Sequence, residues 1–135
     1  MTEAERWLAQ AERDLDDARF AASGSRWNLA CFLSQQAAEK ALKAYLYASG
    51  AETVRGHSVA ELCRDAAGQD AAFRELGADV SALDQYYIPT RYPNGLPGGI
   101  PADAYTHTDG ERALSLSTAV IDFVRAMLPT TRKLR

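Results

Sequence analysis

The residues best suited to chemistry stand together in the octapeptide 86–93, which reads Tyr-Tyr-Ile-Pro-Thr-Arg-Tyr-Pro. Arg91 carries a planar, permanently charged guanidinium whose donors fit a phosphate or a carboxylate. Tyr87 and Tyr92 could each stack on a nucleic-acid base and form a hydrogen bond through the hydroxyl. The structural alternative is a proline-rich turn whose tyrosines pack on neighbouring helices while Arg91 bonds a helix C-terminus. Both interpretations fit the residue types.

The two histidines, His57 and His107, each stand directly before a residue that could cap a helix, Ser58 and Thr108. Either ring could act as a general base or as a ligand, so both join Arg91 as candidate catalytic residues. The more common role in such a position is structural, with the ring packed before the cap or bonded to a backbone carbonyl. No further ligand stands at a recognisable spacing from either histidine, and we expect no metal site.

Three charged residues, Glu39, Lys40 and Lys43, stand in an otherwise apolar helical stretch. Glu39 and Lys43 are four residues apart, in the orientation that favours an ion pair on one helix face. The simplest interpretation is a solvated ion pair. Because the surrounding residues are apolar, these charges need partners, and Asp14 could be one. If the lysines project toward Arg91, they would add further phosphate contacts.

Helical periodicity runs through most of the chain and positions these residues. Thr2 and Ser58 each precede a glutamate by three residues, Glu5 and Glu61, and so predict capping boxes. Apolar residues then recur at spacings of three and four. We predict helices over about 2–24, 26–49, 58–68, 70–87 and 108–128. The second helix should lie at the centre of the bundle, because its apolar surface is wide. The fourth should be kinked or split at Gly77.

Residues 88–108 contain four prolines and three of the glycines, and we expect a long loop there without regular helix. The last helix should start at a capping box formed by Thr108 and Glu111 and stop at Pro129, ahead of a basic tail, 130–135. Its wide apolar surface suggests contact with a second subunit. The predicted fold is all-α: an up-and-down bundle of four main helices plus a short extra helix, in one domain over residues 1–129.

Composition limits the function classes. The net charge of −3 argues against binding nucleic acid over a broad surface, although a local basic site is compatible with it. Cys31 and Cys63 are isolated in apolar stretches, and we expect buried free thiols. The chain has no apolar run of transmembrane length and no secretory charge pattern. We therefore expect a cytoplasmic protein that does not engage a membrane.

Four segments together resemble the HEPN domain family (higher eukaryotes and prokaryotes nucleotide-binding). Their order and spacing extend over residues 5–127, and the central helix followed by the Thr-Arg-Tyr-Pro turn is the most specific combination. The segments are 11–18 (AERDLDDA), 35–44 (QQAAEKALKA), 56–62 (GHSVAEL) and 86–93 (YYIPTRYP).

The resemblance implies a helical bundle that forms a two-fold homodimer in a small prokaryotic protein. It also implies a toxin–antitoxin-like pairing with a minimal nucleotidyltransferase, and nucleotide binding with no other cofactor. Many family members are metal-independent RNA endonucleases with an arginine and a histidine four to six residues apart. This chain departs from that pattern, because residues 92–98 contain no histidine and Arg91 and His107 are sixteen apart. Arg55 and His57 are too close together.

Three hypotheses follow. In the favoured one, the protein is a binding module in which Arg91 grips a phosphate, Tyr87 or Tyr92 stacks on the base, and Lys40 or Lys43 adds charge. In the second it is a ribonuclease, with Arg91 stabilising the phosphorane and a histidine moving the proton. In the third it is purely an interaction protein. The first requires the turn around Arg91 to fold back over the central helix and to leave an anion-sized cavity.

Overall fold

The computed structural model describes residues 1–128, which form six α-helices and three short 3₁₀ segments, with no β-strand among them. The elements in chain order are α1 (Glu3–Ser23), α2 (Trp27–Ala48), α3 (Val59–Ala67), α4 (Ala72–Val80), η1 (Ser81–Tyr86), η2 (Ile88–Thr90), η3 (Pro93–Gly95), α5 (Pro101–Ala104) and α6 (His107–Met127). This confirms the all-α prediction. The predicted helix stop at Pro129, the domain limit at 129 and the tail 130–135 lie outside the described residues.

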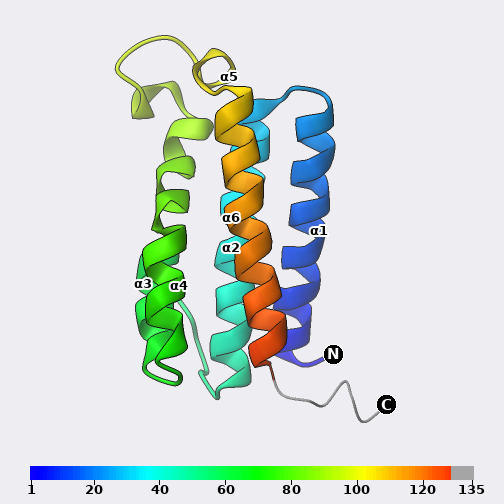
Figure 1. Cartoon of the computed structure of the whole chain (residues 1–135), viewed down its shortest axis with the longest axis vertical. Coiled ribbons are helices and arrows are strands. Elements are labelled where there is room, and N and C mark those ends of the chain that lie inside the picture. The colour runs from blue at the N-terminus through cyan, green and yellow to red at the C-terminus, as the bar shows by residue number, and fades with distance from the viewer. Residues whose placement is uncertain (129–135) are drawn as a thin grey trace.

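Four long rods run alternately up and down: α1, α2, the joined α4 and η1, and α6 (Figure 1). The short extra helix is α3, which lies beside α4. The segment 87–106, with η2, η3 and α5, lies at the end of the bundle where α1 turns into α2, opposite the N-terminus (Figure 1). Within residues 1–128, no helix has both the length and the apolar character needed to cross a bilayer.

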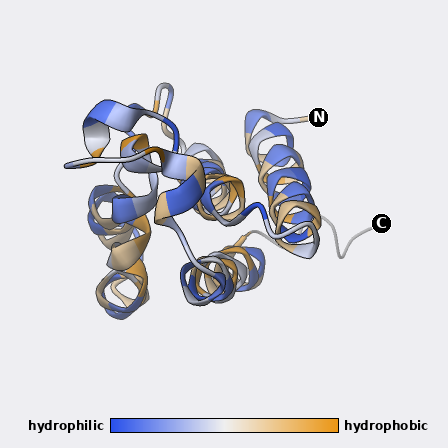
Figure 2. Ribbon diagram, turned by 90° about the horizontal axis from the view of Figure 1, so that it is seen from above, coloured by the Kyte–Doolittle hydropathy of each residue, from blue (hydrophilic) through white to orange (hydrophobic). Residues whose placement is uncertain are grey.

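The central position predicted for the second helix is confirmed, because α2 packs against α1, α3, α5, α6, η1 and η2. Its buried alanines allow these neighbours to approach closely; they are Ala30, Ala37, Ala38, Ala41 and Ala44, all fully buried. The hydrophobic faces of the rods turn toward the space between them (Figure 2). A hydrogen bond from Ser117 Oγ to the Ser34 carbonyl, 2.7 Å, joins α6 to α2 inside this core.

At two of the three predicted capping boxes, the expected residue caps its helix. Thr2 accepts a hydrogen bond from the amide of Glu5, 3.1 Å, and Ser58 accepts one from the amide of Glu61, also 3.1 Å. At the second cap the Ser58 hydroxyl donates to Asp84 in η1 rather than to its own helix. A long-range contact therefore completes this helix start.

The predicted start of the last helix is wrong. The cap is Thr106, whose amide and hydroxyl both donate to the Asp109 carboxylate at 2.9 and 3.0 Å while the Asp109 amide donates back to the Thr106 hydroxyl. Two overlapping capping patterns are present, and extended backbone at Thr106 selects the earlier one. Thr108 and His107 consequently lie inside the first turn of α6.

The predicted break at Gly77 does not occur, since α4 continues through this residue to Val80. A Cβ atom at Gly77 would lie 2.9 Å from the Cβ of Cys63, so the glycine lets α3 and α4 pack closely. Beyond Val80 the chain tightens into the 3₁₀ segment η1, and the predicted helix over 70–87 is in fact two joined segments.

The proline-rich segment contains more helix than predicted. η2, η3 and α5 each have a proline in the first turn, where the missing amide hydrogen costs no hydrogen bond. The prolines therefore stand in the first turn of each segment, and their spacing limits each segment to a single turn. The expectation of no regular helix was wrong for α5, which has four residues.

Both cysteines are free and buried, as predicted. Burial raises the pKa of the Cys31 and Cys63 thiols to about 12, so both stay protonated near neutral pH.

Candidate functional site

The Thr-Arg-Tyr-Pro turn is fixed to α2 through a buried threonine. The hydroxyl of Thr90 donates to the carbonyls of Tyr86 and Tyr87, at 2.9 and 2.7 Å, and its side chain is fully buried. The side-chain amide of Asn28, near the start of α2, donates to the Thr90 carbonyl at 3.1 Å. These bonds satisfy the backbone of the turn and hold the next residue, Arg91, against the helix.

Arg91 lies over an aromatic ring of α2, at one end of a row of three rings. Its guanidinium carbon is 5.4 Å from the centroid of Phe32, although the arginine itself is exposed. Phe32 stacks on Tyr87 at 6.3 Å between centroids, and Tyr87 stacks on His57 at 4.9 Å. We call Phe32, Tyr87 and His57 the aromatic row. The guanidinium suits a phosphate, and the exposed His57 ring at the far end of the row suits a base, because Tyr87 has a ring on each side.

At the other end of the row, His57 contacts a buried carboxylate. Its Nδ1 lies 3.2 Å from Oε2 of Glu39, whose side chain is 5% exposed, whereas the His57 side chain is 58% exposed. The same carboxylate pairs with Lys43 at 3.1 Å, and Gln35 donates to its other oxygen at 3.3 Å. The Gln35 amide also donates to the His57 carbonyl at 2.9 Å. Glu39 thus contacts the histidine ring and Gln35 holds the backbone of His57, while more than half of the His57 side chain stays exposed.

The two lysines of α2 are each bound to a carboxylate. The Lys43 ammonium pairs with Glu39 and lies 5.4 Å from the ring centroid of Trp7, and its side chain is only 7% exposed. Lys40 pairs with Asp14 of α1 at 2.6 Å, which confirms the partner expected from the sequence. Much of the positive charge of both lysines is therefore neutralised inside the protein.

The remaining predicted residues are placed differently. Tyr92 is 58% exposed and follows Arg91 directly in the turn. Tyr86, the third phenol of the octapeptide, is buried edge-on against Tyr105 at 6.1 Å, and burial raises its pKa. His107 packs edge-on against Trp27 at 4.9 Å and lies 3.2 Å from Glu111 in its own helix. The contacts of His107 are thus with Trp27 and Glu111, which do not belong to the aromatic row.

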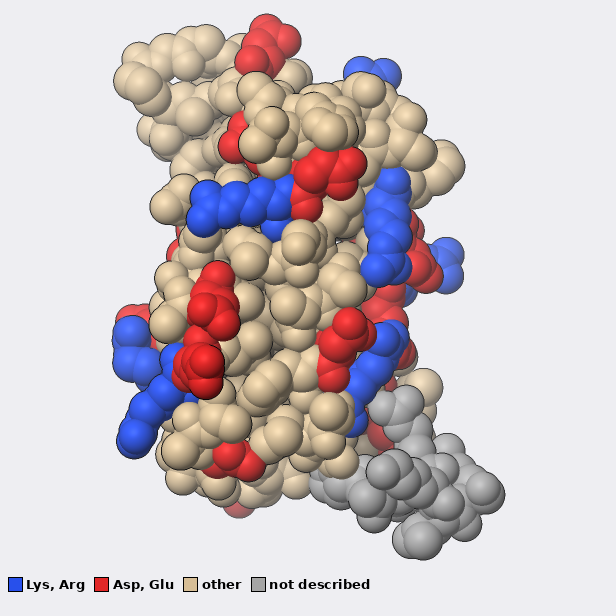
Figure 3. Space-filling view, viewed as in Figure 1, with Lys and Arg blue, Asp and Glu red and all other residues tan. Residues whose placement is uncertain are grey.

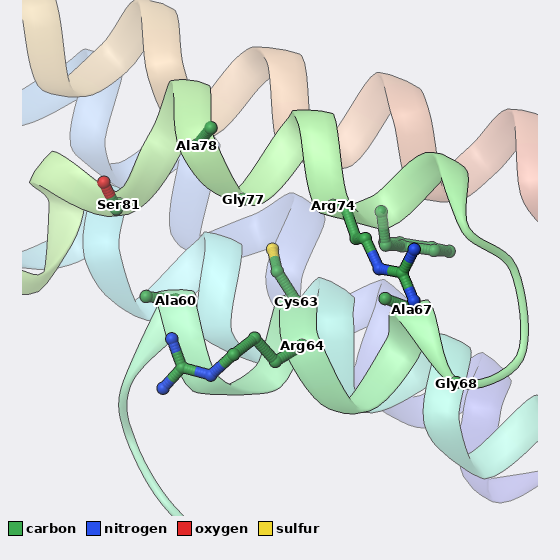
Figure 4. Close-up of a pocket in the computed structure, with 10 residues that line it drawn as sticks. Ala60, Cys63, Arg64, Ala67, Gly68, Arg74, Gly77, Ala78 and Ser81 are labelled. Atoms are coloured by element: carbon green, nitrogen blue, oxygen red, sulfur yellow. The ribbon is translucent and has the colours of Figure 1, made fainter.

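The expected fold-back of the turn over α2 is present, with Asn28 bound to the Thr90 carbonyl and Arg91 over Phe32. A groove of about 610 Å³ runs between α3 and α4 (Figure 4), and no predicted site residue lines it. At Arg91 itself, the exposed guanidinium lies over the Phe32 ring. No three His, Cys, Asp or Glu side chains converge as a metal site within residues 1–128.

Two residues of this site, Phe32 and Gln35, were not predicted. A signal for them exists in the sequence, because Phe32, Gln35, Glu39 and Lys43 are spaced by three, four and four residues. This spacing places all four on one strip of α2. The strip contains an aromatic, an amide and both signs of charge, which is unusual for a helix face that packs only against a core.

The comparisons with known proteins agree with one another. The sequence model of the HEPN domain matches residues 4–127. A protein of Methanocaldococcus jannaschii, named Putative toxin MJ1304, is 26% identical over 131 residues, covering 90% of this chain and 86% of its own length.

Solved structures extend the likeness to the fold. TT1696 from Thermus thermophilus is 38% identical with a TM-score of 0.83, covering 95% of this chain and 100% of that one. ST0689, an archaeal HEPN homologue, is also 38% identical, with a TM-score of 0.76 and coverage of 96% and 100%. A HEPN domain protein of Thermotoga maritima, tm0613, is 28% identical with a TM-score of 0.69 and coverage of 90% and 96%. From the match over nearly its whole length and from the shared fold, the chain belongs to the HEPN domain family.

Proposed function

We propose that this HEPN domain binds a nucleotide, free or at an RNA end, through Arg91 and the aromatic row. The observation that carries the proposal is the stack itself: an exposed guanidinium over Phe32, with Tyr87 between Phe32 and His57. A guanidinium binds phosphate through charge-assisted hydrogen bonds, and aromatic faces stack on bases. Arg91 and the row supply both kinds of group within one surface.

The lysines have a smaller part in the proposal than the sequence suggested. Asp14 and Glu39 already pair with Lys40 and Lys43. A phosphate would have to compete with these carboxylates, so we assign the main phosphate contact to Arg91. Tyr92 is exposed beside Arg91 and can close over a bound base.

We further propose that the domain is the toxin-like member of a pair with a minimal nucleotidyltransferase, and that it works as a homodimer. The support is the archaeal relative named as a toxin and the family membership. The last helix adds support, because Leu114, Leu116 and Phe123 of α6 are only partly buried in the single chain and could contact a second subunit.

Replacing Arg91 with Ala is expected to weaken nucleotide binding by about tenfold or more, because a hydrogen bond to a charged group contributes about 1.5–3 kcal/mol. Isothermal titration calorimetry with ATP, GTP and a short RNA measures this. Arg13 serves as the matched control, since it is exposed on α1 and pairs only loosely with Asp17 at 3.7 Å. Arg13→Ala should bind like the wild type.

Two results would count against this function. Absence of binding by the wild-type protein at millimolar nucleotide would remove the ligand class. Equal affinities for wild type and Arg91→Ala would remove the assigned site. If Arg91→Ala also left co-purification with a partner protein unchanged, the interaction-protein hypothesis would become the better one.

A second function, metal-independent RNA cleavage, is favoured by one contact. Glu39 orients the His57 ring through Nδ1, and the exposed ring could take a proton from an attacking 2′-hydroxyl. Arg91 lies at the opposite end of the aromatic row from His57, so it would hold a neighbouring phosphate of the RNA rather than the phosphorane itself. A histidine oriented by a third group is the arrangement found in catalytic triads.

Cleavage should therefore depend on His57 and not on His107. We expect His57→Ala to lose about 10²-fold or more in cleavage rate, the usual size of a general-base contribution. His107→Ala should keep its activity, because that ring packs on Trp27. The assay is cleavage of a labelled single-stranded RNA in the presence of EDTA. Cleavage that persists in both variants would exclude a histidine mechanism.

A further inference from the structure

The groove between α3 and α4 is a second surface with features of a binding site, and it shares no residue with the aromatic row. Its volume is about 610 Å³, and it opens between two helices of nine residues each (Figure 4). Small residues line both walls at helical spacing: Ala60, Cys63 and Ala67 on α3, and Gly77, Ala78 and Ser81 on α4 or just after it. Short side chains at this spacing leave room for the ridge of another helix.

The base of the groove is apolar and closed. Gly77 sits directly against Cys63, where a Cβ atom would meet the Cys63 Cβ at 2.9 Å. Phe73 and Cys63 are buried there, and burial keeps the Cys63 thiol protonated by raising its pKa to about 12. These residues close the floor, and the contact area open to an apolar side chain comes from the wall residues Ala60, Ala67 and Ala78.

The two charged side chains that line the groove have the same sign, and the carboxylates of these helices, such as Glu61, stand outside its lining. The charged residues that line it are Arg64 on α3 and Arg74 on α4, one on each wall. Arg74 reaches across toward Ala67, and Arg64 extends along α3 toward Ala60 (Figure 4). Within residues 1–128, Arg64 makes one ion pair, a loose and exposed one with Glu61 at 3.9 Å. In the space-filling view, basic and acidic side chains stand side by side along the α3 and α4 edge of the molecule (Figure 3).

The lining favours a protein segment over a small ligand. Small-molecule sites usually place a few polar groups precisely to orient the ligand. Apart from the two arginines and Ser81, this groove is lined by Ala, Gly, Phe and Cys. Its length matches about two and a half turns of helix, about 13 Å at 1.5 Å per residue. An amphipathic helix with acidic residues beside its apolar face would meet both the small residues of the walls and the arginines.

We propose that the α3–α4 groove docks an acidic amphipathic helix of a partner protein. The apolar face of that helix enters between Ala60, Ala67 and Ala78, and its carboxylates pair with Arg64 and Arg74. This docking surface goes beyond the nucleotide function of the aromatic row and does not depend on it.

The probe is a fluorescein-labelled synthetic peptide of about 20 residues, long enough to hold a helix, with leucines on one face and glutamates beside them. A second peptide carries lysine in place of each glutamate. We expect the acidic peptide to bind the full chain and to shift the amide NMR signals of α3 and α4. The double variant Arg64→Glu/Arg74→Glu should bind it about tenfold more weakly or worse and should instead bind the lysine peptide.

Three controls make the outcome decisive. The variant Arg13→Glu/Arg19→Glu changes the net charge equally on α1 and should bind the acidic peptide normally. Ala78→Trp fills the groove from an exposed position and should block binding without reversing charge. Arg91→Ala should leave peptide binding intact, which separates this proposal from the nucleotide site.

The docking proposal fails if the acidic peptide does not shift α3 and α4 signals at millimolar concentration. It also fails if Ala78→Trp or the groove charge reversal binds as tightly as the wild type. ATP and inorganic phosphate form a parallel titration. If they shift the same α3 and α4 amide signals and displace the peptide, the groove is a binding site for small anions and the proposal is overturned.

Discussion

Replacing Lys43 with Met is expected to lower the free energy of unfolding by about 3–5 kcal/mol, the usual cost of breaking a buried ion pair by removing one partner. Lys43 and Glu39 pair at 3.1 Å, with side chains 7% and 5% exposed. Methionine keeps the shape of the side chain, so the loss comes from the charge. Glu39 would be left as a buried carboxylate with only Gln35 and His57 beside it. Urea unfolding followed by circular dichroism measures the change.

The double variant Glu39→Met/Lys43→Met tests the physical reason. With both charges removed, we expect much of the lost stability to return, since a buried ion pair contributes little beyond a well-packed apolar pair. Arg13→Met breaks an exposed pair of the same spacing and should cost less than about 1 kcal/mol. A cost for Lys43→Met as small as that for Arg13→Met would show that the Glu39 carboxylate is well solvated, contrary to its burial.

Replacing Asp84 with Ala is expected to lower the free energy of unfolding by about 2–4 kcal/mol, because one carboxylate accepts several hydrogen bonds at the start of α3. Asp84 accepts from the Ser58 hydroxyl at 2.7 Å and from the amides of Val59 and Ala60 at 2.6 and 3.2 Å. It also brings a negative charge to the positive end of the helix dipole. Its loss would leave these amides without their partner and detach η1 from α3. Thermal and urea unfolding both measure the effect.

Asp70 provides the comparison for Asp84. It accepts a single amide bond, from Ala72 at 3.0 Å, near the start of α4, and is close in sequence to its partner. Asp70→Ala should cost about 1 kcal/mol, typical of an ordinary cap. The conservative variant Asp84→Asn should retain part of the stability through its amide oxygen. Similar costs at positions 84 and 70 would mean that the contact between η1 and α3 does not stabilise the fold beyond local capping.

The sequence predicted correctly where the determinant is local. The stripe of Leu8, Ala11 and Leu15 and the wide apolar surface of α2 report burial directly, because helix periodicity fixes which residues share a face. Thr2 and Ser58 cap helices because a cap needs only the amides three residues onward. The start of α6 was missed where Thr106 and Thr108 offered overlapping local patterns.

The site was predicted less completely than the fold. The octapeptide made Arg91 and Tyr87 candidates, and their positions against α2 agree with the expected fold-back. The lysines were assigned to a ligand, whereas in the folded chain their ammonium groups meet Asp14 and Glu39. Phe32 was missed because a phenylalanine in an apolar helix is expected to pack in the core. Its contact with Arg91 becomes visible only in the folded chain.

By itself the sequence determined the helices, the central place of α2 and the family, since periodicity, caps and short motifs are properties of neighbouring residues. Only the tertiary structure decided which charges neutralise one another, that Arg91 lies over Phe32, that Glu39 holds His57, and that the groove opens between α3 and α4. The physical reason is that charge pairing, ring stacking and surface shape depend on distances between residues far apart in the chain, and helical periodicity does not specify those distances.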